Sequence, residues 1–323
     1  MKNVGILLPY DYKLMTVASI LDVFETVNSI YFTNKRELPF HIQLFQTSEQ
    51  INKEGNSFHN YIIKSLKSRE KIDLVLIPSF TSTNLYHSIE RNKEFVLWLQ
   101  QQFKGGAEIA SFCTGALLFA SAGLLNGKLA TTHVDACPNF LVSYPLVFVK
   151  PGRTLTVDGR CYTSGGSTSS FHLLVFLIQK YCGHEMAVRI SKIFAIELDR
   201  HQQSYFSTFR PDYSHNDALV KKIQKKLEAG YLTINTIEEV TKDLPASRRN
   251  MVRRFKQATG IPPIEYLQNI RVETSKKLLE QTDLNISQVI SHTGYADPKS
   301  FRKVFLKLVG ITPLEYREKF KVK

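Results

Sequence analysis

The segment FKQATGIPPIEY at residues 255–266 returns fifty residues later as FLKLVGITPLEY at residues 305–316. Six of the twelve positions are identical, which predicts one structural unit that is present twice. Each copy has a short helical stretch, a turn (residues 244–246 in the first copy) and a second helix. That second helix begins at a capping residue, Ser247 or Asp297, and ends at a glycine. Two short helices joined by a tight turn form a helix-turn-helix, whose second helix can enter the DNA major groove.

The two copies are expected to be joined by a rigid helix. The first helix of each copy is predicted at residues 237–243 and 286–293. The segment between the copies opens at Pro263 and keeps apolar residues at helical spacing to about Gln281. A helix of that length spans about 25 Å. Because successive major-groove faces lie ~34 Å apart, one chain can present both second helices to one face of a duplex.

The second helix of each copy has an apolar side and a basic side. Met251 and Phe255, and Phe301 and Phe305 in the second copy, have the spacing of inward-facing residues. Cationic and amide groups on the opposite side suit phosphate and guanine recognition. These candidate DNA-binding residues are Arg248, Arg249, Asn250 and Arg253 in the first copy and Lys299, Arg302 and Lys303 in the second. Charges that merely solvate a helix are the alternative, but the shared pattern of the two copies favours DNA contact.

Most of the chain's net positive charge lies in the same region. The 323 residues carry a net charge of +13. Residues 217–323 hold 21 basic and 12 acidic residues, whereas residues 1–216 hold 21 and 17. This uneven surplus favours a polyanionic partner for the last third of the chain. With 43% hydrophobic and 22% charged residues, the chain is not expected to be disordered, and its apolar runs are too short for a bilayer, so no membrane partner is expected.

The cysteines and the first residues indicate the compartment. The four cysteines, Cys113, Cys137, Cys161 and Cys182, are widely spread and match neither a zinc signature nor a disulfide framework. The first apolar run stops at Pro9, which does not resemble a signal peptide. We therefore expect no metal site, no cofactor and a reducing, cytoplasmic location.

The first two hundred residues alternate short apolar runs with helix-period segments. Strands are predicted at residues 4–8, 41–46, 74–77, 108–111 and 146–149, and helices at 17–31, 94–102, 115–122, 171–181 and 187–198. This alternation favours an α/β domain with a largely parallel sheet. Asp158-Gly159, in the middle of the alternating residues 154–163, predicts a two-residue hairpin.

One cysteine lies where a strand is expected to meet a helix. In SFCTG at residues 111–115, Cys113 occupies the predicted turn, and small residues open the helix. Such a turn aims its side chain into a cleft above the sheet, where the helix dipole favours a thiolate. His133 lies downstream of that helix and could be brought beside the cysteine. Cys113, Thr114 and His133 are therefore the candidate residues of a ligand pocket.

These motifs resemble those of two known families. SFCTG, together with GLLNGKLATTH at residues 123–133 and YTSGG at 162–166, is similar to the class I glutamine amidotransferase-like family. More narrowly, it resembles the GlxA-like regulators, in which that domain is fused to an AraC-type DNA-binding domain. The last third resembles the AraC-type domain itself, with matches that include Arg249, Arg253, Gly260, Pro263, Arg271, Gly294, Gly310 and Pro313. The resemblance implies a flavodoxin-like, amidotransferase-like α/β sandwich at residues 1–200, a linker at 201–216, and an all-α domain with two helix-turn-helix units at 217–323.

The resemblance also implies a function. It predicts a sequence-specific, DNA-binding transcription regulator that a small ligand controls through the first domain. The implied partners are double-stranded DNA, an unidentified small-molecule effector and, as a homodimer, a second copy of the chain. It adds Val252 and Pro298 to the positions that face bases. Because Pro298 has no polar side chain and Lys303 replaces a frequent arginine, the second unit is expected to bind more through phosphates than through bases.

A cysteine-dependent amidase or hydrolase of the same fold, with a DNA-binding tail, is the main alternative. A nucleic-acid scaffold without ligand control is another. A cysteine hydrolase needs a thiolate, a base, an orienting acid and an oxyanion hole. The resemblance implies a Gly-Gly pair after a strand-ending proline and an acidic residue early in the first helix of catalytic relatives. Here Ser79 and Phe80 follow Pro78, and Thr16 replaces the acid. We therefore expect no catalysis and a vestigial cysteine and histidine, with residual thiol chemistry left open.

Overall fold

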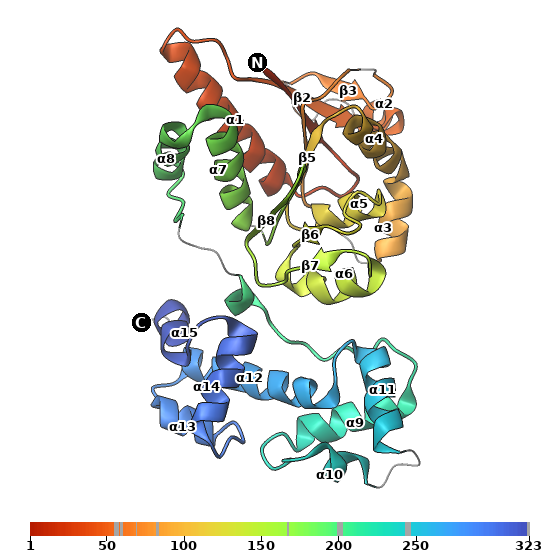
Figure 1. Cartoon of the computed structure of the whole chain (residues 1–323), viewed down its shortest axis with the longest axis vertical. Helices are drawn as coiled ribbons and strands as arrows, with labels where there is room; N and C mark the ends of the chain where they lie inside the picture. Colours follow the sequence, from red (N-terminus) through yellow and green to blue (C-terminus); the bar gives the residue numbers. More distant parts are fainter. Residues whose placement is uncertain are drawn as a thin grey trace. The chain divides into compact units, whose positions relative to one another are not determined.

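The computed structural model describes residues 1–54, 58, 61–68, 70–81, 84–166, 168–198, 203–242 and 247–321. The chain forms two compact units, Met1–Gln203 and Ser204–Lys323 (Figure 1). The division lies inside the segment 201–216, which the sequence suggested as a linker. Within the described ranges, no helix is both long and apolar enough to cross a membrane, and no group of His, Cys, Asp and Glu could hold a metal ion.

A single main sheet forms the centre of the first unit. In the described residues its seven strands have the order β3-β2-β1-β4-β5-β9-β8, and every neighbouring pair is parallel except β8 and β9. The strands are β1 (Lys2–Leu7), β2 (Phe40–Gln46), β3 (Ile63–Ser65), β4 (Leu74–Ile77), β5 (Glu108–Ser111), β8 (Leu155–Asp158) and β9 (Cys161–Ser164). The predicted flavodoxin-like α/β architecture is confirmed.

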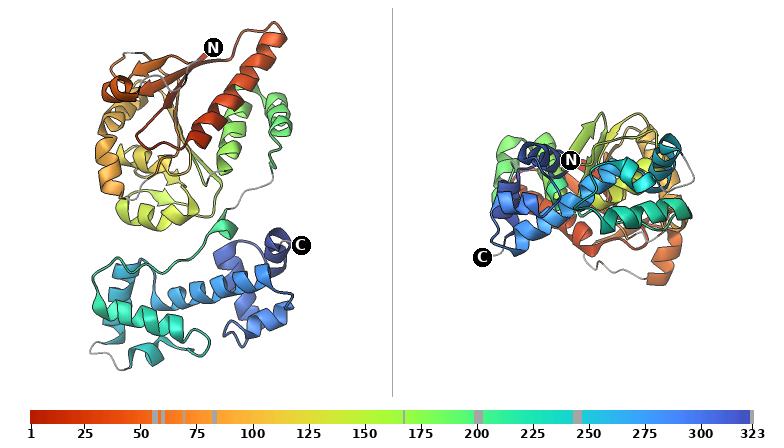
Figure 2. Two further views of the ribbon diagram at one scale, coloured as in Figure 1. Left: turned by 180° about the vertical axis from the view of Figure 1, so that it is seen from behind. Right: turned by 90° about the horizontal axis from the view of Figure 1, so that it is seen from below.

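Helices cover both faces of this sheet, as the two orientations in Figures 1 and 2 show. On one face, α1 (Leu14–Thr33), α7 (Ser169–Cys182) and α8 (His184–Ile193) share a core with β1, β2 and β4. On the other face, α3 (Leu85–Arg91), α4 (Lys93–Lys104) and α5 (Gly115–Ser121) form a second core, which includes the buried Trp98. The remaining elements of this unit are α2 (Ser48–Glu54), α6 (Cys137–Ser143) and the short paired strands β6 (Leu129–Ala130) and β7 (Phe148–Val149).

Several boundaries in this unit differ from the prediction: the strand expected at 146–149 is only Phe148–Val149, and two other differences have a clear backbone cause. Asp158 pairs with Cys161, so the hairpin loop is Gly159-Arg160, one residue later than expected. Gly159 has a φ of 59°, the left-handed conformation that a two-residue hairpin turn requires. Helix α8 ends at Ile193, five residues before the expected Leu198, because Ala195 has a φ of 51° and cannot continue a right-handed helix.

The second unit is helical. Its helices are α9 (Ala218–Ala229), α10 (Ile237–Thr241), α11 (Arg248–Thr259), α12 (Pro263–Gln281), α13 (Ile286–Ser291), α14 (Pro298–Val309) and α15 (Pro313–Phe320). The pairs α10–α11 and α13–α14 are the two expected helix-turn-helix units, and α12 connects them. The predicted turn at 244–246 lies outside the described residues.

The ends of the two second helices are set by the residues that the sequence indicated. Ser247 accepts a hydrogen bond from the Asn250 amide at the start of α11, and Asp297 caps α14 through two amides of its first turn. Gly260 and Gly310 have φ angles of 80° and 86°, and end the same helices in the left-handed conformation. The internal repeat therefore specifies both caps of each second helix.

Candidate DNA interface and ligand pocket

Helix α11 buries one side and exposes the other. Met251 and Phe255 are fully buried against α9, α10 and α12. Arg249, Asn250 and Arg253 are exposed, while Val252 is half-buried at the edge of the apolar side. Within the ranges that the structure describes, neither Arg249 nor Arg253 forms an ion pair, so both guanidinium groups are available to an anionic partner.

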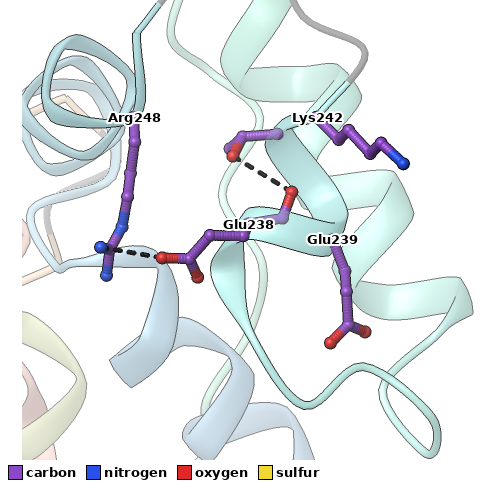
Figure 3. Close-up of a pocket in the computed structure, with 5 residues that line it drawn as sticks. Glu238, Glu239, Lys242 and Arg248 are labelled. Carbon is purple, nitrogen blue, oxygen red and sulfur yellow. Dashed lines mark hydrogen bonds and ion pairs between the residues drawn. The ribbon is translucent and has the colours of Figure 1, made fainter.

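Arg248 is already engaged by the neighbouring helix. Its Nη1 lies 2.8 Å from Oε1 of Glu238 on α10, and Figure 3 shows the two side chains directed toward each other. Glu239, Thr241 and Lys242 line the same hollow. Because both charged side chains are more than half exposed, the pair contributes only about 0–1 kcal/mol. Arg248 therefore links the start of α11 to α10, and a phosphate would have to compete with Glu238 for it.

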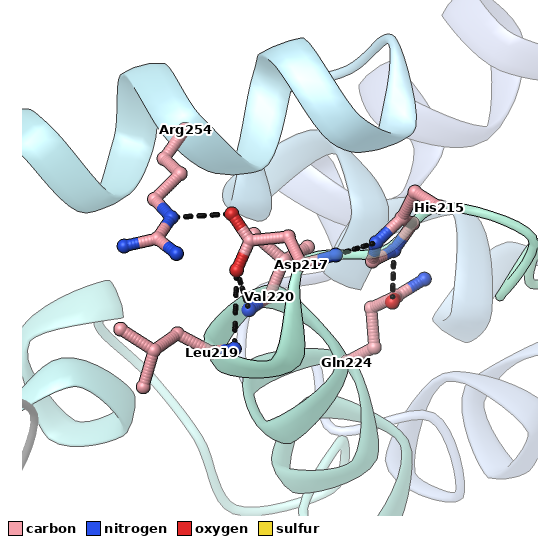
Figure 4. A network of polar contacts seen from close by, with 6 residues as sticks. All are labelled: His215, Asp217, Leu219, Val220, Gln224 and Arg254. Carbon is pink, nitrogen blue, oxygen red and sulfur yellow. Dashed lines mark hydrogen bonds and ion pairs between the residues drawn. The ribbon is translucent and has the colours of Figure 1, made fainter.

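Arg254, the neighbour of Arg253, serves the fold instead. Its Nε pairs with Asp217, the N-cap of α9, which also accepts hydrogen bonds of 3.1 Å from the amides of Leu219 and Val220 (Figure 4). Burial opposes ionisation of Asp217, but Arg254 and the two amides outweigh it and hold the pKa of this carboxyl below its usual value. Among the arginines of α11, Arg254 therefore stabilises the fold, whereas Arg249 and Arg253 face solvent. Helical spacing alone did not reveal this difference.

Helix α14 repeats this arrangement with different polar residues. Phe301 and Phe305 are fully buried in the core that α14 shares with α12, α13 and α15. Lys299, Arg302 and Lys303 are exposed, and so is Pro298, at the first position of the helix. The candidate residues of α14 therefore offer three cations and no amide group.

The connector α12 is tied to both helix-turn-helix units. Its Arg271 is buried and donates hydrogen bonds of 2.8 Å to the carbonyl oxygens of Tyr231 and Ile234, in the loop between α9 and α10. The same guanidinium lies 5.1 Å from the ring centroid of Tyr295, in the turn between α13 and α14 of the second helix-turn-helix. Burial lowers the pKa of Arg271 from its usual value.

Gly294 provides a second link between the two helix-turn-helix halves of the DNA-binding unit. A Cβ at this glycine would lie 2.7 Å from the carbonyl oxygen of Leu232 and 2.8 Å from that of Tyr231. The turn of the second helix-turn-helix, between α13 and α14, therefore packs directly on the backbone of the loop between α9 and α10. No larger residue fits at Gly294. With a 19-residue connector of about 28 Å, the two second helices are held in one fixed arrangement.

In the first unit, Cys113 occupies the predicted turn between β5 and α5. Its φ is 54°, a left-handed conformation that is strained for a residue with a side chain. The side chain is only 6% exposed. Gly115, at the start of α5, permits the turn because a Cβ there would lie 2.5 Å from the carbonyl oxygen of Ile77. The sharp strand-to-helix turn expected from the sequence is present.

The residues that depart from the expected catalytic pattern are held by hydrogen bonds near the cysteine turn. Thr16, in the place of the acid, shares a 2.5 Å hydrogen bond with the hydroxyl of Ser79. Thr114 Oγ1 accepts the backbone N–H of Phe80 at 3.0 Å and donates to the carbonyl oxygen of Phe80 at 2.7 Å. The two departures from the catalytic pattern are therefore built into the packing of the turn.

The segment of His133 packs against the cysteine turn. The hydroxyl of Thr132 donates a 2.9 Å hydrogen bond to the carbonyl oxygen of Cys113. His133 is half-buried, and its Nδ1 accepts the amide of Asp135 at 3.2 Å. The thiol of Cys137 lies below the same segment, and burial raises its pKa to about 12. The fold thus brings the segments of Cys113, Thr114 and His133 together.

The two units define a class of protein: an α/β domain with a cysteine turn, followed by paired helix-turn-helix units. A model of the DJ-1/PfpI family matches residues 4–180, more than half of the chain. The chain therefore belongs to the DJ-1/PfpI family. A model described as a helix-turn-helix domain matches residues 240–319. Both resemblances expected from the sequence are confirmed.

Relatives of known name support the same combination. The chain is 27% identical over 227 residues to the HTH-type transcriptional regulator GbdR of Pseudomonas aeruginosa, a match that covers 70% of this chain and 62% of GbdR. It is 24% identical to the HTH-type transcriptional regulator GlxA of Rhizobium meliloti, over 66% of each chain. A crystal structure of a putative transcriptional regulator from Vibrio parahaemolyticus shares the fold, with a TM-score of 0.51 and 19% identity over 59% of this chain and 98% of that one.

Proposed function

We propose that this protein is a sequence-specific, DNA-binding transcription regulator of the cytoplasm. The observation that carries the proposal is the pair of helix-turn-helix units, each with a buried apolar side and an exposed basic side. Arg271 and Gly294 hold these units in one arrangement, which suits successive major grooves of one duplex. The named relatives are transcriptional regulators, in agreement with this proposal.

The two units are proposed to read DNA in different ways. Arg249 and Arg253, exposed together with Asn250, are suited to bidentate contacts with guanine and adenine edges. Among the candidate residues of α14 the exposed cations are two lysines and one arginine, and Pro298 offers no polar group. Because lysine acts as a point charge, the second helix-turn-helix (α13–α14) is expected to contribute mainly phosphate contacts.

To test this proposal, two positive charges are removed from the proposed DNA interface, and two from the first unit as a control. The double variant Arg249→Ala with Arg253→Ala is compared with Lys35→Ala with Lys104→Ala, which removes two exposed charges from the first unit. Binding is measured by titrating labelled duplexes at several salt concentrations. The proposal predicts that only the first variant loses affinity and has a shallower salt dependence. Wild-type affinity and salt dependence in that variant would refute it.

The first unit is proposed to bind a small-molecule effector and not to turn it over. The turn of Cys113, Thr114 and the segment of His133 form the proposed pocket. Thr16 stands where the resemblance implies an acid, and Ser79 and Phe80 stand where it implies a Gly-Gly pair. Dimerisation of the chain is part of the same proposal. Cys113→Ser is expected to weaken the response of DNA binding to the effector. An unchanged response would exclude a role for Cys113 in the pocket, and amide turnover lost in Cys113→Ala would revive the hydrolase.

A further inference from the structure

The last residue of the first unit inserts its side chain into that unit. Gln203 is 1% exposed. The two hydrogens of its Nε2 are shared among three acceptor oxygens within hydrogen-bond distance, and its Oε1 accepts one backbone amide. The partners of this carboxamide, which we name the amide cradle, are Thr131 Oγ1 (3.2 Å), Thr132 O (3.0 Å), Pro151 O (2.9 Å) and the Gly166 N–H (2.9 Å). The backbone N–H of Gln203 also donates to Gly152 O at 2.9 Å. Both ends of the carboxamide are thus satisfied by the first unit.

The cradle has the shape of a carboxamide. A Cβ at Gly165 would lie 2.0 Å from Oε1 of Gln203, so this glycine leaves room for the amide and for little else. Acceptors surround the Nε2 position, and a donor faces the Oε1 position. A carboxylate would place an oxygen against those acceptors, and an ammonium would leave the Gly166 N–H without an acceptor. A planar group with one donating end and one accepting end fits best.

The cradle adjoins the cysteine turn. Thr132, whose carbonyl oxygen accepts from Gln203, donates its hydroxyl hydrogen bond to Cys113. Gly166 lies beside the ring of His133, since a Cβ at this glycine would be 3.0 Å from Cδ2. Ser164, which immediately precedes the cradle glycines, is fully buried, and its hydroxyl has no hydrogen-bond partner among the described residues. A buried hydroxyl without a partner among the described residues, at the carboxyl end of β9, is a polar group that a ligand could satisfy.

We propose that the amide cradle is a binding site for primary carboxamides, that Gln203 is its internal occupant, and that a small carboxamide competes with Gln203. The second unit begins at Ser204, directly after Gln203. Displacement therefore releases from the first unit the residue that directly precedes the DNA-binding unit. The regulatory meaning of this step rests on the proposed function, whereas the binding site does not.

The first experiment removes the internal occupant. In full-length protein, Gln203→Ala and Gln203→Glu are compared with Gln100→Ala, which loses a single hydrogen bond from an exposed glutamine. Hydrogen exchange of the Gly166 amide and tryptic cleavage after Arg200, the nearest arginine before Gln203 in the sequence, are measured. Both Gln203 variants should exchange Gly166 about tenfold faster and be cleaved faster between the units, while Gln100→Ala matches wild type. Equal exchange and cleavage in all four proteins would overturn the proposal. Because no DNA is present, this result is independent of the proposed function.

The second experiment refills the cradle. Acetamide reproduces the atoms that Gln203→Ala lacks, and acetate is its charged counterpart. Rising acetamide should restore the slow exchange of the Gly166 amide in Gln203→Ala and should accelerate tryptic cleavage of wild type, whereas acetate should do neither. No rescue by acetamide, or equal rescue by acetate, would overturn the assignment of the site. A DNA affinity that is the same in Gln203→Ala and wild type would overturn the regulatory step and leave DNA binding itself intact.

Discussion

Two glycines with nearly the same backbone provide a matched test of how the helix-turn-helix units are held. Gly294 has a φ of 75° and Gly260 a φ of 80°, so an alanine at either position has the strain of a left-handed conformation. They differ in their surroundings. A Cβ at Gly260 would meet nothing within 4 Å, whereas one at Gly294 would lie 2.7 Å and 2.8 Å from two backbone oxygens. Comparing the two substitutions therefore separates the cost of the left-handed backbone from the cost of the contact between Gly294 and the α9–α10 loop.

The expected magnitudes follow from these surroundings. The left-handed strain alone costs about 1–2 kcal/mol, which is the whole expected effect of Gly260→Ala. Gly294→Ala adds overpacking against backbone atoms that cannot rotate away, which costs about 1–3 kcal/mol more. The expected loss in the free energy of unfolding is thus about 1–2 kcal/mol for Gly260→Ala and about 2–5 kcal/mol for Gly294→Ala.

Urea unfolding of the full chain can measure this difference, because the two units have separate reporters. The single tryptophan, Trp98, is buried in the first unit, so its fluorescence follows that unit. Circular dichroism at a helical wavelength includes the second unit. Gly294→Ala should shift the helical transition further than Gly260→Ala and leave the fluorescence transition in place. Equal shifts in the two variants would refute the packing of the α13–α14 turn on the loop between α9 and α10.

Three further predictions concern the interface and its support. Arg253→Ala should cost about 1–3 kcal/mol of specific binding and relax the preference at one base pair, measured on a panel of single-base variants of a selected site; an equal loss on every sequence would contradict base contact. Lys303→Ala should instead lower affinity uniformly and reduce the salt slope by about one, and a changed base preference would contradict a phosphate role. The lowered pKa of Asp217 stabilises the second unit above the carboxyl's ordinary pKa of about 4, and this stabilisation is lost as the pH falls through the folded value. Acid unfolding of Asp217→Asn should therefore depend less on pH than that of wild type, and an identical acid limb would argue against the pair with Arg254.

The parts of the fold that local sequence determines were predicted well. Strands β4 and β5 and the connector α12 have the predicted bounds, because a proline, a glycine or a continuous apolar run marks their ends. Helices α9 and α15 were missed, although Asp217 and Thr312 are good caps, because the internal repeat does not include α9 and stops within α15. Strands β6 and β7 have two residues each and depend on tertiary pairing, which no periodicity reveals.

The candidate sites show the same division between local and tertiary information. Helical spacing predicted that Arg249 and Arg253 face outward, but only the position of α9 shows that Arg254 pairs with Asp217. The turn of Cys113 was predicted from five residues. The role of Gln203 was not, because the partners of its carboxamide lie 37 to 72 residues away in the sequence. No motif of neighbouring residues could have indicated that contact.

Selection of DNA from a random duplex library by the purified full-length protein tests the central claim most directly. The account predicts enrichment of one site with two conserved blocks about one helical turn apart, the block read by α11 being the more strongly specified. The Arg249→Ala, Arg253→Ala double variant should lose that block. No enrichment over the starting library, or an enriched site that this variant still selects, would contradict the account.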